Sequence, residues 1–403
     1  MATTSTTSTS VAAVLRDDAE ALAQARRLAA SFAVEAADRD RDRRIPHAEL
    51  DELSASGLLA ATVPAAHGGA DITTRTLLEV FRLLASADPS IAQIPQSHFA
   101  YVNVLRESAT PEQEQFFFAE LLAGKRFGNA QSETGSRTVQ DVQTRLQDTG
   151  EGDFVLNGRK GYSTGALLAH WIPMLAKDDE DRLQVAYVPR DAEGVEVIDD
   201  WAGMGQRTTA SGTVVLDRVR VPADRIVPHH LTFERPQLHG ALAQALHAAI
   251  DVGIAAGALD EAAEFVRTRS RPWGEAGVDT AAEDPLTIQR FGDLGIRLRA
   301  AEALLDEAGA AIDAARADLT DESAGAASIA VAAAKAFADG TAIELTNALF
   351  EVSGARSSLD SANLHRHWRN ARTHTLHDPV RWKVHHVGRY TLNGTLPPRH
   401  GQI

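Results

Sequence analysis

The first third of the chain repeats apolar residues at intervals of three and four, which is the spacing of one face of an α-helix. Proline, glycine and N-capping residues interrupt this repeat and divide it into successive helices. The predicted helices begin near Val11, Pro46, Thr73, Ser90 and Pro111. We therefore expect a helical domain over residues 13–125, preceded by a disordered Ser/Thr/Ala-rich tail over residues 1–12.

Over residues 126–232 the apolar runs become short, rich in β-branched residues and bounded by turn residues. This pattern is typical of antiparallel strands and predicts a small β-barrel or sandwich. The predicted strands cover residues 127–131, 142–146, 154–156, 171–176, 183–188, 195–198 and 212–221. We expect this segment to form a separate middle domain.

The helical repeat returns after residue 232 in three long stretches rich in alanine, leucine and glutamate. They cover residues 237–271, 286–317 and 323–353 and predict an antiparallel bundle in a C-terminal domain of residues 233–403. Polar residues interrupt every apolar window of transmembrane length, so no membrane span is expected. The fold class predicted from this order is α+β and mainly helical.

Composition narrows the possible functions. Lysine and arginine number 40 against 55 aspartates and glutamates, for a net charge of -15, so the positive surface of a nucleic-acid-binding protein is not expected. The sequence has no cysteine, which excludes disulfides, thiolate metal sites and a cysteine nucleophile. Because the start of the chain lacks a secretory pattern, the expected location is cytoplasmic.

The strongest candidate for a site is a histidine-rich segment near the C-terminus. Seven of the 15 histidines lie between His365 and His400, and so many polar rings are costly to bury without a purpose. Within this segment, the dipeptide His377-Asp378 pairs an imidazole with a carboxylate that can tune its proton affinity. Asp378 could alternatively cap a helix that starts at Pro379. No His-Glu-x-x-His spacing is present, and no metal site is expected.

Three motifs, in the order of the chain, resemble segments of the acyl-CoA dehydrogenase superfamily. They are Gln131-Ser-Glu-Thr-Gly-Ser, Leu156-Asn-Gly-Arg-Lys-Gly-Tyr-Ser-Thr-Gly-Ala and Gly203-Met-Gly-Gln-Arg. The segment Arg369-Asn-Ala-Arg-Thr-His-Thr-Leu-His-Asp-Pro is similar to that of a narrower branch, the sulfur-acquisition oxidoreductases and dibenzothiophene monooxygenases. The resemblance implies an acyl-CoA dehydrogenase-like fold, with an N-terminal helical domain, a middle β domain and a C-terminal four-helix bundle.

The resemblance also implies roles for individual residues. His377 occupies the place of the branch's catalytic histidine, with Asp378 supporting it, and His98 matches a second histidine that lines the active site. Trp201 is expected to line the substrate pocket. Residues expected at the flavin are Asn129, Gln131, Ser132, Tyr162, Ser163 and Thr164, and those expected near its phosphate are Arg269, Arg271, Gly354 and Arg369. In this family, arginines placed like Arg269 and Arg271 reach the flavin of a neighbouring subunit.

The function implied by the resemblance is that of a two-component monooxygenase. Reduced FMN from a separate flavin reductase would react with O2, and the resulting C4a-hydroperoxyflavin would oxygenate a small or aromatic organosulfur compound. The chain shows no glycine-rich nicotinamide-binding motif, and the acidic Glu351 near a pyrophosphate would favour FMN over FAD. The resemblance also implies a homotetramer.

Two other interpretations of the same fold stay open. The first is an FAD-dependent acyl-CoA dehydrogenase in which Asp378 is the catalytic base, at the position of the family's glutamate. The second is a flavin-free interaction protein that has kept the fold. Flavin binding separates the second interpretation from the others, and reaction with an acyl-CoA identifies the first.

Overall fold

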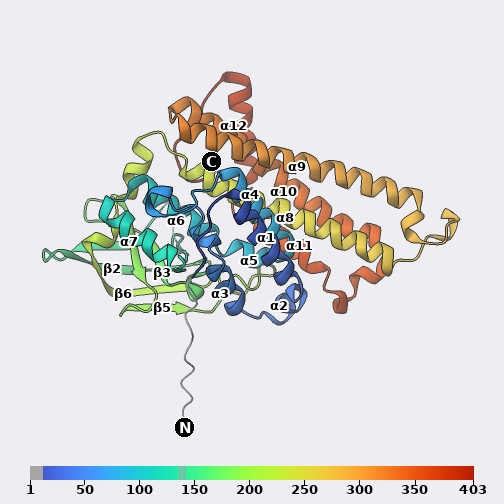
Figure 1. The fold of residues 1–403 in the computed structure, drawn as a ribbon, viewed down its shortest axis with the longest axis horizontal. Helices are drawn as coiled ribbons and strands as arrows, with labels where there is room; N and C mark the ends of the chain where they lie inside the picture. Colours follow the sequence, from blue (N-terminus) through green and yellow to red (C-terminus); the bar gives the residue numbers. More distant parts are fainter. Residues whose placement is uncertain (1–11, 136–137, 139–140) are drawn as a thin grey trace, which may run out of the picture.

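The computed structural model describes residues 12–135, 138 and 141–403 (Figure 1). The tail predicted for residues 1–12 lies outside the described residues except for Ala12, which is buried. Three blocks follow one another along the chain: short helices, a β-sheet and long helices. In Figure 1 the sheet lies at one end of the molecule and the long C-terminal helices extend from the other, with N-terminal helices between them.

The N-terminal block forms helices that cover both the sheet and the long helices. They are α1 (Asp18–Ala33), α2 (Ala36–Asp42), α3 (His47–Ala55), α4 (Thr74–Ala87), α5 (Pro89–Gln93), α6 (Gln96–Ser108) and α7 (Pro111–Leu122). Thr110 caps α7 through a capping box with Gln113. The helix predicted from residue 90 is divided into α5 and α6 at Pro95, because proline lacks the N–H that the helical ladder needs.

The middle block forms one seven-stranded sheet among the described residues, with the strand order β5-β6-β2-β1-β3-β4-β7. The strands are β1 (Arg145–Asp148), β2 (Asp153–Lys160), β3 (Trp171–Lys177), β4 (Leu183–Pro189), β5 (Val195–Ile198), β6 (Thr213–Pro222) and β7 (Ile226–Val227). Neighbouring strands are antiparallel except β1 and β3, which pair in parallel. The predicted strand 127–131 is present as two isolated bridges, of Phe127 with Trp171 and of Ala130 with Met174.

The C-terminal block confirms the three predicted long helices. They are α8 (His239–Thr268), α9 (Pro285–Ala317) and α10 (Asp321–Ser353), and two shorter helices follow, α11 (His365–His374) and α12 (Val380–Asn393). By length and hydropathy α8 and α10 could cross a membrane, but 89% of the apolar window of α8 and 56% of that of α10 are buried inside the protein. Their apolar side chains therefore pack against neighbouring helices.

Helix α8 is the central element of the core. Leu246 and Ile250 of α8 belong to the same apolar cluster as Phe81 of α4. Two glycines allow α4 to approach α8 closely, because a Cβ on Gly253 would collide with the Arg82 carbonyl and one on Gly257 with the Ser86 carbonyl. This packing fixes α8, which carries several of the polar side chains described below.

Candidate active site

Two loops of the sheet and helix α11 meet at one place. The β5–β6 loop, residues 199–212, is joined to α11 because the Gln206 backbone N–H donates to the Asn370 side chain at 2.7 Å. A Cβ on the neighbouring Gly205 would collide with the Arg369 carbonyl, so this close approach requires glycine. The β2–β3 loop, residues 161–170, is joined to the β5–β6 loop through the Ser163 N–H, which donates to the Gly212 carbonyl at 3.0 Å.

The two loops present the exposed ring of Tyr162 and the half-buried ring of Trp201 beside buried hydroxyls. Tyr162 and Trp201 form an edge contact with ring centroids 6.1 Å apart, and Tyr162 is 60% exposed. Thr164 Oγ1 lies 2.7 Å from Ser211 Oγ, whereas the buried Ser163 Oγ has no hydrogen-bond partner among the described residues. Tyr162 also has a left-handed φ of 53°. Backbone strain and an unpaired buried hydroxyl are features of ligand-binding loops.

His377 lies in the turn between α11 and α12, in contact with its acidic neighbour. His377 Nδ1 is 3.0 Å from Asp378 Oδ2, and the same oxygen accepts a hydrogen bond of 2.9 Å from Gln244 Nε2 of α8. The His377 side chain is 48% exposed and that of Asp378 only 10%. Burial alone would raise the pKa of Asp378, but the hydrogen bond and charge of His377 outweigh burial and lower that pKa. The ionised carboxylate therefore holds Nδ1–H, which leaves Nε2 as the free nitrogen of His377.

Helix α11 connects the β5–β6 loop, which it contacts at Asn370, to the turn that carries His377. Asn370, which binds the β5–β6 loop, lies one helical turn before His374 at the end of α11. His377 follows three residues after His374, in the turn that leads to α12. Contacts among the two loops and α11 thus bring Tyr162, Thr164 and Trp201 to one region, and the place of His377 beside them stays a prediction.

Behind His377 lie buried polar residues that the sequence did not single out as site residues. The ring of His247 on α8 contacts that of His377 with centroids 4.0 Å apart, and His247 Nδ1 is 3.1 Å from His374 Nε2. His374 Nδ1 lies 2.6 Å from Asp251 Oδ1, and Asp251 pairs with Lys335 of α10. The sequence could have indicated this pair, because Asp251 and Lys335 each lie inside an apolar helix, and a buried charge is costly unless it is paired.

The ring of His98 is buried and contacts two backbone groups. Its buried ring on α6 has Nε2 2.7 Å from the Leu59 carbonyl and Nδ1 3.0 Å from the Phe127 N–H, which donates to it. Burial lowers the pKa of His98 to about 4, so the ring is neutral. Both ring nitrogens thus serve backbone groups in this structure, and the catalytic role implied for His98 stays a prediction.

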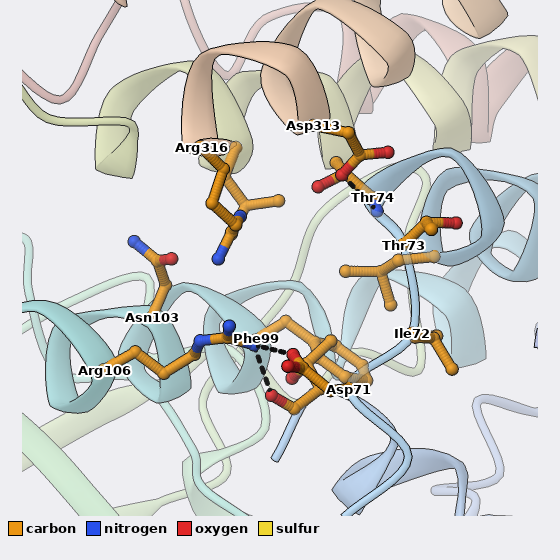
Figure 2. A pocket seen from close by; sticks show the side chains of 12 residues that line it. Asp71, Ile72, Thr73, Thr74, Phe99, Asn103, Arg106, Asp313 and Arg316 are labelled. Atoms are coloured by element: carbon orange, nitrogen blue, oxygen red, sulfur yellow. Dashed lines mark hydrogen bonds and ion pairs between the residues drawn. The ribbon is translucent and has the colours of Figure 1, made fainter. Parts of the chain in front are cut away.

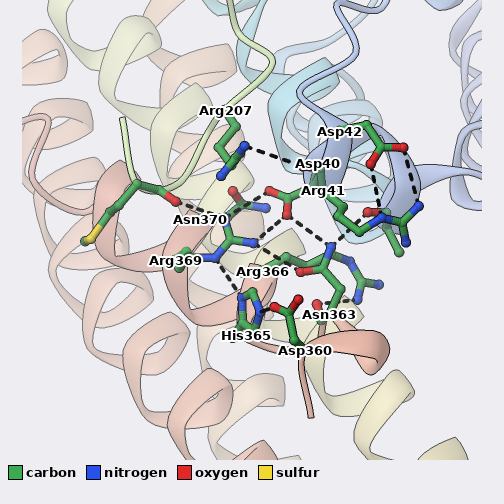
Figure 3. A network of polar contacts seen from close by, with 12 residues as sticks. Asp40, Arg41, Asp42, Arg207, Asp360, Asn363, His365, Arg366, Arg369 and Asn370 are labelled. Carbon is green, nitrogen blue, oxygen red and sulfur yellow. Dashed lines mark hydrogen bonds and ion pairs between the residues drawn. The ribbon is translucent and has the colours of Figure 1, made fainter. Parts of the chain in front are cut away.

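Arg369 forms hydrogen bonds within the chain, in the polar network of Figure 3. Its guanidinium pairs with the buried Asp40 and donates to the Met204 carbonyl at 2.8 Å and to His365 Nδ1 at 2.8 Å. With a further bond of 3.2 Å to Asn363, each of its five N–H groups has an acceptor. The donors of Arg369 are therefore all used within the chain in this structure, and the phosphate role implied for it stays a prediction.

The other residues predicted near the phosphate form a second group. About 33 Å of helix α8 separates His247 from Arg269, which caps the C-terminus of that helix. Gly354 belongs to this group because the neighbouring Ser270 hydroxyl donates to the Ser353 carbonyl at 2.9 Å. A Cβ on Gly354 would meet no atom within 4 Å. Within one chain, Arg269, Arg271 and Gly354 are thus not brought to His377.

Asn129, Gln131 and Ser132 lie on the segment that leads from α7 into the sheet. The Tyr101 hydroxyl donates to Asn129 Oδ1 at 3.5 Å. The Ser132 carbonyl accepts from the Gly161 N–H at 3.0 Å, which holds this segment beside the β2–β3 loop. The Gln131 carbonyl accepts from the buried Lys160 ammonium at 3.2 Å, while the Gln131 side chain is exposed.

A cavity of ≈ 190 Å³ lies apart from these residues, between α4, α6 and α9 (Figure 2). Arg106 reaches Asp71 there at 2.7 Å, and Arg316 points toward them from α9. None of the residues predicted for the site lines this cavity. Within the described ranges, no three histidine, aspartate or glutamate residues are grouped so that they could hold a metal ion.

Known families match the same three blocks of the chain. The models for the N-terminal, middle and C-terminal domains of acyl-CoA dehydrogenase match residues 16–125, 127–219 and 245–382. The chain belongs to the acyl-CoA dehydrogenase family. The family and the fold predicted from the motifs are therefore confirmed.

This acyl-CoA dehydrogenase family member is similar over most of its length to monooxygenases. It is 36% identical to a dibenzothiophene monooxygenase of Rhodococcus erythropolis over 396 residues, 94% of this chain and 95% of the relative. The structure of FMN-bound TdsC from Paenibacillus sp. A11-2 matches with a TM-score of 0.91 and 32% identity, covering 95% of this chain and 100% of that one. The methanesulfinate monooxygenase MsuC from Pseudomonas fluorescens matches with a TM-score of 0.88 and 34% identity, covering 95% and 99%. The branch predicted from the C-terminal motif is thereby confirmed.

Proposed function

We propose that this protein is an FMN-dependent monooxygenase that transfers one oxygen atom from O2 to an organosulfur compound. Its similarity to monooxygenases of dibenzothiophene and methanesulfinate supports the reaction class. Because one of these compounds is aromatic and the other is small, both kinds of substrate are candidates. The observation that carries the proposal is the His377–Asp378 pair, an oriented imidazole at the turn where the resemblance places the glutamate of the dehydrogenases.

His377 supplies the acid–base chemistry in this proposal. Asp378 holds its Nδ1–H, so that the lone pair of Nε2 can take a proton and later return it. The buried carboxylate stabilises the ring when it is protonated, because a hydrogen bond to an ionised acceptor is stronger than one to a neutral acceptor. An imidazole exchanges protons in both directions near neutral pH, which suits a step that must both donate and accept.

The loops around Tyr162 fit the chemistry of FMN. The unpaired Ser163 Oγ and the neighbouring Thr164 Oγ1 offer hydroxyls to the polar edge of a flavin ring, and Tyr162 and Trp201 offer aromatic surfaces. Bound reduced FMN supplies the electrons that activate O2. The residues of this chain bind and orient the ring, and His377 moves the proton.

The dehydrogenase interpretation requires Asp378 to abstract a proton from the substrate. Its side chain is 10% exposed and one of its oxygens already accepts hydrogen bonds from His377 and Gln244. The same contacts lower its pKa, and a carboxylate with a lowered pKa is a weaker base. The geometry therefore favours His377 over Asp378 as the group that meets the substrate.

We further propose that the protein is a homotetramer in which a neighbouring copy completes the flavin site. Apolar side chains are exposed along the outer helices, including Leu286 (75%) and Ile296 (70%) of α9 and Leu392 (82%) of α12. Arg269 and Arg271 are exposed, and open space surrounds Gly354, as a phosphate site contributed to another subunit would require. We place the protein in the cytoplasm, where a separate flavin reductase supplies reduced FMN.

Product formation tests the reaction class. The protein, reduced FMN and O2 are mixed with dibenzothiophene or with methanesulfinate, and oxygenated product is measured by mass spectrometry. We expect product from at least one of these compounds, and the more efficient one identifies the substrate class. Bleaching of bound flavin by an acyl-CoA, with no oxygenated sulfur product, would instead support the dehydrogenase.

Subunit mixing tests the shared flavin site. Variants Arg271→Ala and His377→Ala, each expected to be inactive as a homotetramer, are coexpressed with different tags and purified as hybrids. We expect hybrids to regain part of the activity, because some sites then combine an intact His377 with an intact Arg271 from the neighbouring copy. Inactive hybrids would contradict the shared site.

A further inference from the structure

A buried polar chain runs from His377 into the centre of the helical bundle. His247 of α8 lies against the His377 ring, and its Nδ1 is 3.1 Å from His374 Nε2 of α11. His374 Nδ1 is 2.6 Å from Asp251, which follows His247 by one turn of α8. Asp251 in turn pairs at 2.9 Å with the Lys335 ammonium of α10. Three helices are therefore linked through side chains that end at the candidate catalytic residue.

The inner end of this chain is ionised but carries no net charge. Lys335 and Asp251 are 1% and 0% exposed, and Lys335 also pairs with Asp339 on the same helix. Burial would lower the pKa of Lys335, but Asp251 and Asp339 outweigh burial and raise that pKa. Burial, together with the charge of Asp251, raises the pKa of Asp339 to about 8, so Asp339 is protonated at neutral pH. One ammonium then faces one carboxylate, the arrangement in which buried charges are tolerated.

This arrangement decides which ring nitrogens carry protons. The ionised Asp251 accepts a hydrogen bond from His374 Nδ1–H, which leaves His374 Nε2 as an acceptor. His247 Nδ1–H donates to that acceptor. Burial, followed by the charges of His377 and His374, keeps the pKa of His247 well below its ordinary value, so its ring is neutral. His247 thus presents a neutral ring in a defined orientation to His377.

We propose that His247 is a positioning residue for His377, and that the buried chain through His374, Asp251 and Lys335 holds the His247 ring in the orientation that supports His377. The proposal rests on the proposed function and adds to it a second layer behind the catalytic histidine. Asp378 fixes His377 at Nδ1, while His247 covers one face of its ring at 4.0 Å. Together the two contacts restrict the rotation of the ring and direct Nε2 outward. Because His247 is neutral, it does not repel His377 when that ring takes a proton.

Two substitutions at His247 separate the contributions of the ring and of its hydrogen bond. His247→Asn keeps a donor at the position of Nδ1 and removes the ring, whereas His247→Phe keeps a ring and removes the donor. A misplacement of about 1 Å can cost roughly 100-fold in rate, so a loosened His377 ring is expected to lower kcat about tenfold. We expect this loss in His247→Asn and a smaller one in His247→Phe, with KM and the Kd of FMN within about twofold of the native values.

The second readout does not depend on turnover. Diethyl pyrocarbonate modifies neutral imidazoles, and peptide mass spectrometry gives the rate at each histidine. The exposed His47 of α3 serves as the internal reference for His377. We expect the ratio of the His377 rate to the His47 rate to rise severalfold in His247→Asn, because one face of the ring is uncovered. Asp251→Asn, which weakens the anchor two links away, should raise this ratio in the same direction by less.

A matched control is His229→Asn, the same substitution at a buried histidine that contacts Phe233 and His239. It should lower stability while leaving the ratio of the His377 and His47 rates unchanged. An unchanged ratio and unchanged kcat in His247→Asn would overturn the proposal, and so would an equal rise of the ratio in the control. If His247→Asn does not fold, the same outcomes are scored on His247→Ala, which also removes the ring that covers His377.

The two measurements also separate this inference from the proposed function. If the native protein oxygenates no sulfur compound, the proposed function fails, yet the modification rates still report whether His247 positions His377. If the native protein oxygenates its substrate but Asp251→Asn changes only the unfolding temperature, with kcat and His377 reactivity unaltered, the buried chain does not reach the active site and that claim is overturned.

Discussion

Replacing Asp378 by asparagine removes one negative charge while an oxygen can stay in nearly the same place. Asp378 Oδ2 accepts from His377 Nδ1 at 3.0 Å and from Gln244 Nε2 at 2.9 Å. An amide oxygen can accept both bonds, but the bond to a protonated His377 loses about 1 to 1.5 kcal/mol of charge assistance. This difference corresponds to a kcat that is about tenfold lower in Asp378→Asn. Asp378→Ala, which also leaves the Gln244 amide without its acceptor, should lose about 100-fold.

The assay is steady-state oxygenation of a sulfur substrate with reduced FMN, measured from about pH 6 to pH 9. The folded-state pKa of Asp378 is lowered from 3.8, so its carboxylate stabilises the fold fully above that value. This stabilisation is lost only as the pH falls through the lower folded value, so the contribution of Asp378 to stability is constant across the assay range. Native kcat in Asp378→Asn at every pH would refute the coupling between Asp378 and His377.

Three further substitutions test single residues. Arg369→Met breaks a buried ion pair with Asp40 and should lower the unfolding free energy by about 3 to 5 kcal/mol in urea titrations, while the Kd of FMN, read by flavin fluorescence, stays native. A large rise in that Kd would instead indicate that Arg369 binds the flavin phosphate. Burial lowers the pKa of His98 from 6.5 to about 4, so the neutral ring stabilises the fold above pH 6.5 and about 3 kcal/mol of that stability is lost as the pH falls toward 4. In His98→Asn, urea titrations should show lower stability at pH 7 but a shallower acid loss, and an unchanged slope would contradict the assignment. Tyr162→Ala removes an aromatic surface worth about 0.5 to 1.5 kcal/mol and should raise the Kd of FMN about two- to tenfold, whereas a native Kd would place the flavin elsewhere.

Local patterns in the sequence predicted a helix or strand correctly where the interactions that determine it join residues close together in the chain. The amphipathic repeat and N-cap of α4 and the capping box of α7 depend on residues within a few positions of one another. α2 was not predicted because five of its seven residues are charged and give no apolar repeat. The break at Pro95 shows that a single missing donor can outweigh a continuous helical pattern.

The site residues show the same difference between local contacts, which could be predicted, and long-range contacts, which could not. His377-Asp378 was predicted because its two members are adjacent, and the structure places them 3.0 Å apart. The contact between Arg369 and Asp40 could not be predicted, because Asp40 lies 329 residues earlier in the chain. The role of His247 could not be predicted either, because its hydrogen-bond partner His374 lies 127 residues later in the chain. A sequence motif identifies a residue type at a position, but long-range packing decides which of its donors are still free.

The most direct test of the central claim, oxygen transfer assisted by His377, is mass spectrometry of the product formed under oxygen-18 gas with reduced FMN. The account predicts that the native protein places one atom of oxygen-18 on the sulfur compound, and that His377→Ala binds FMN normally but forms little labelled product. An unlabelled product from the native protein, or undiminished labelling by His377→Ala, would contradict it.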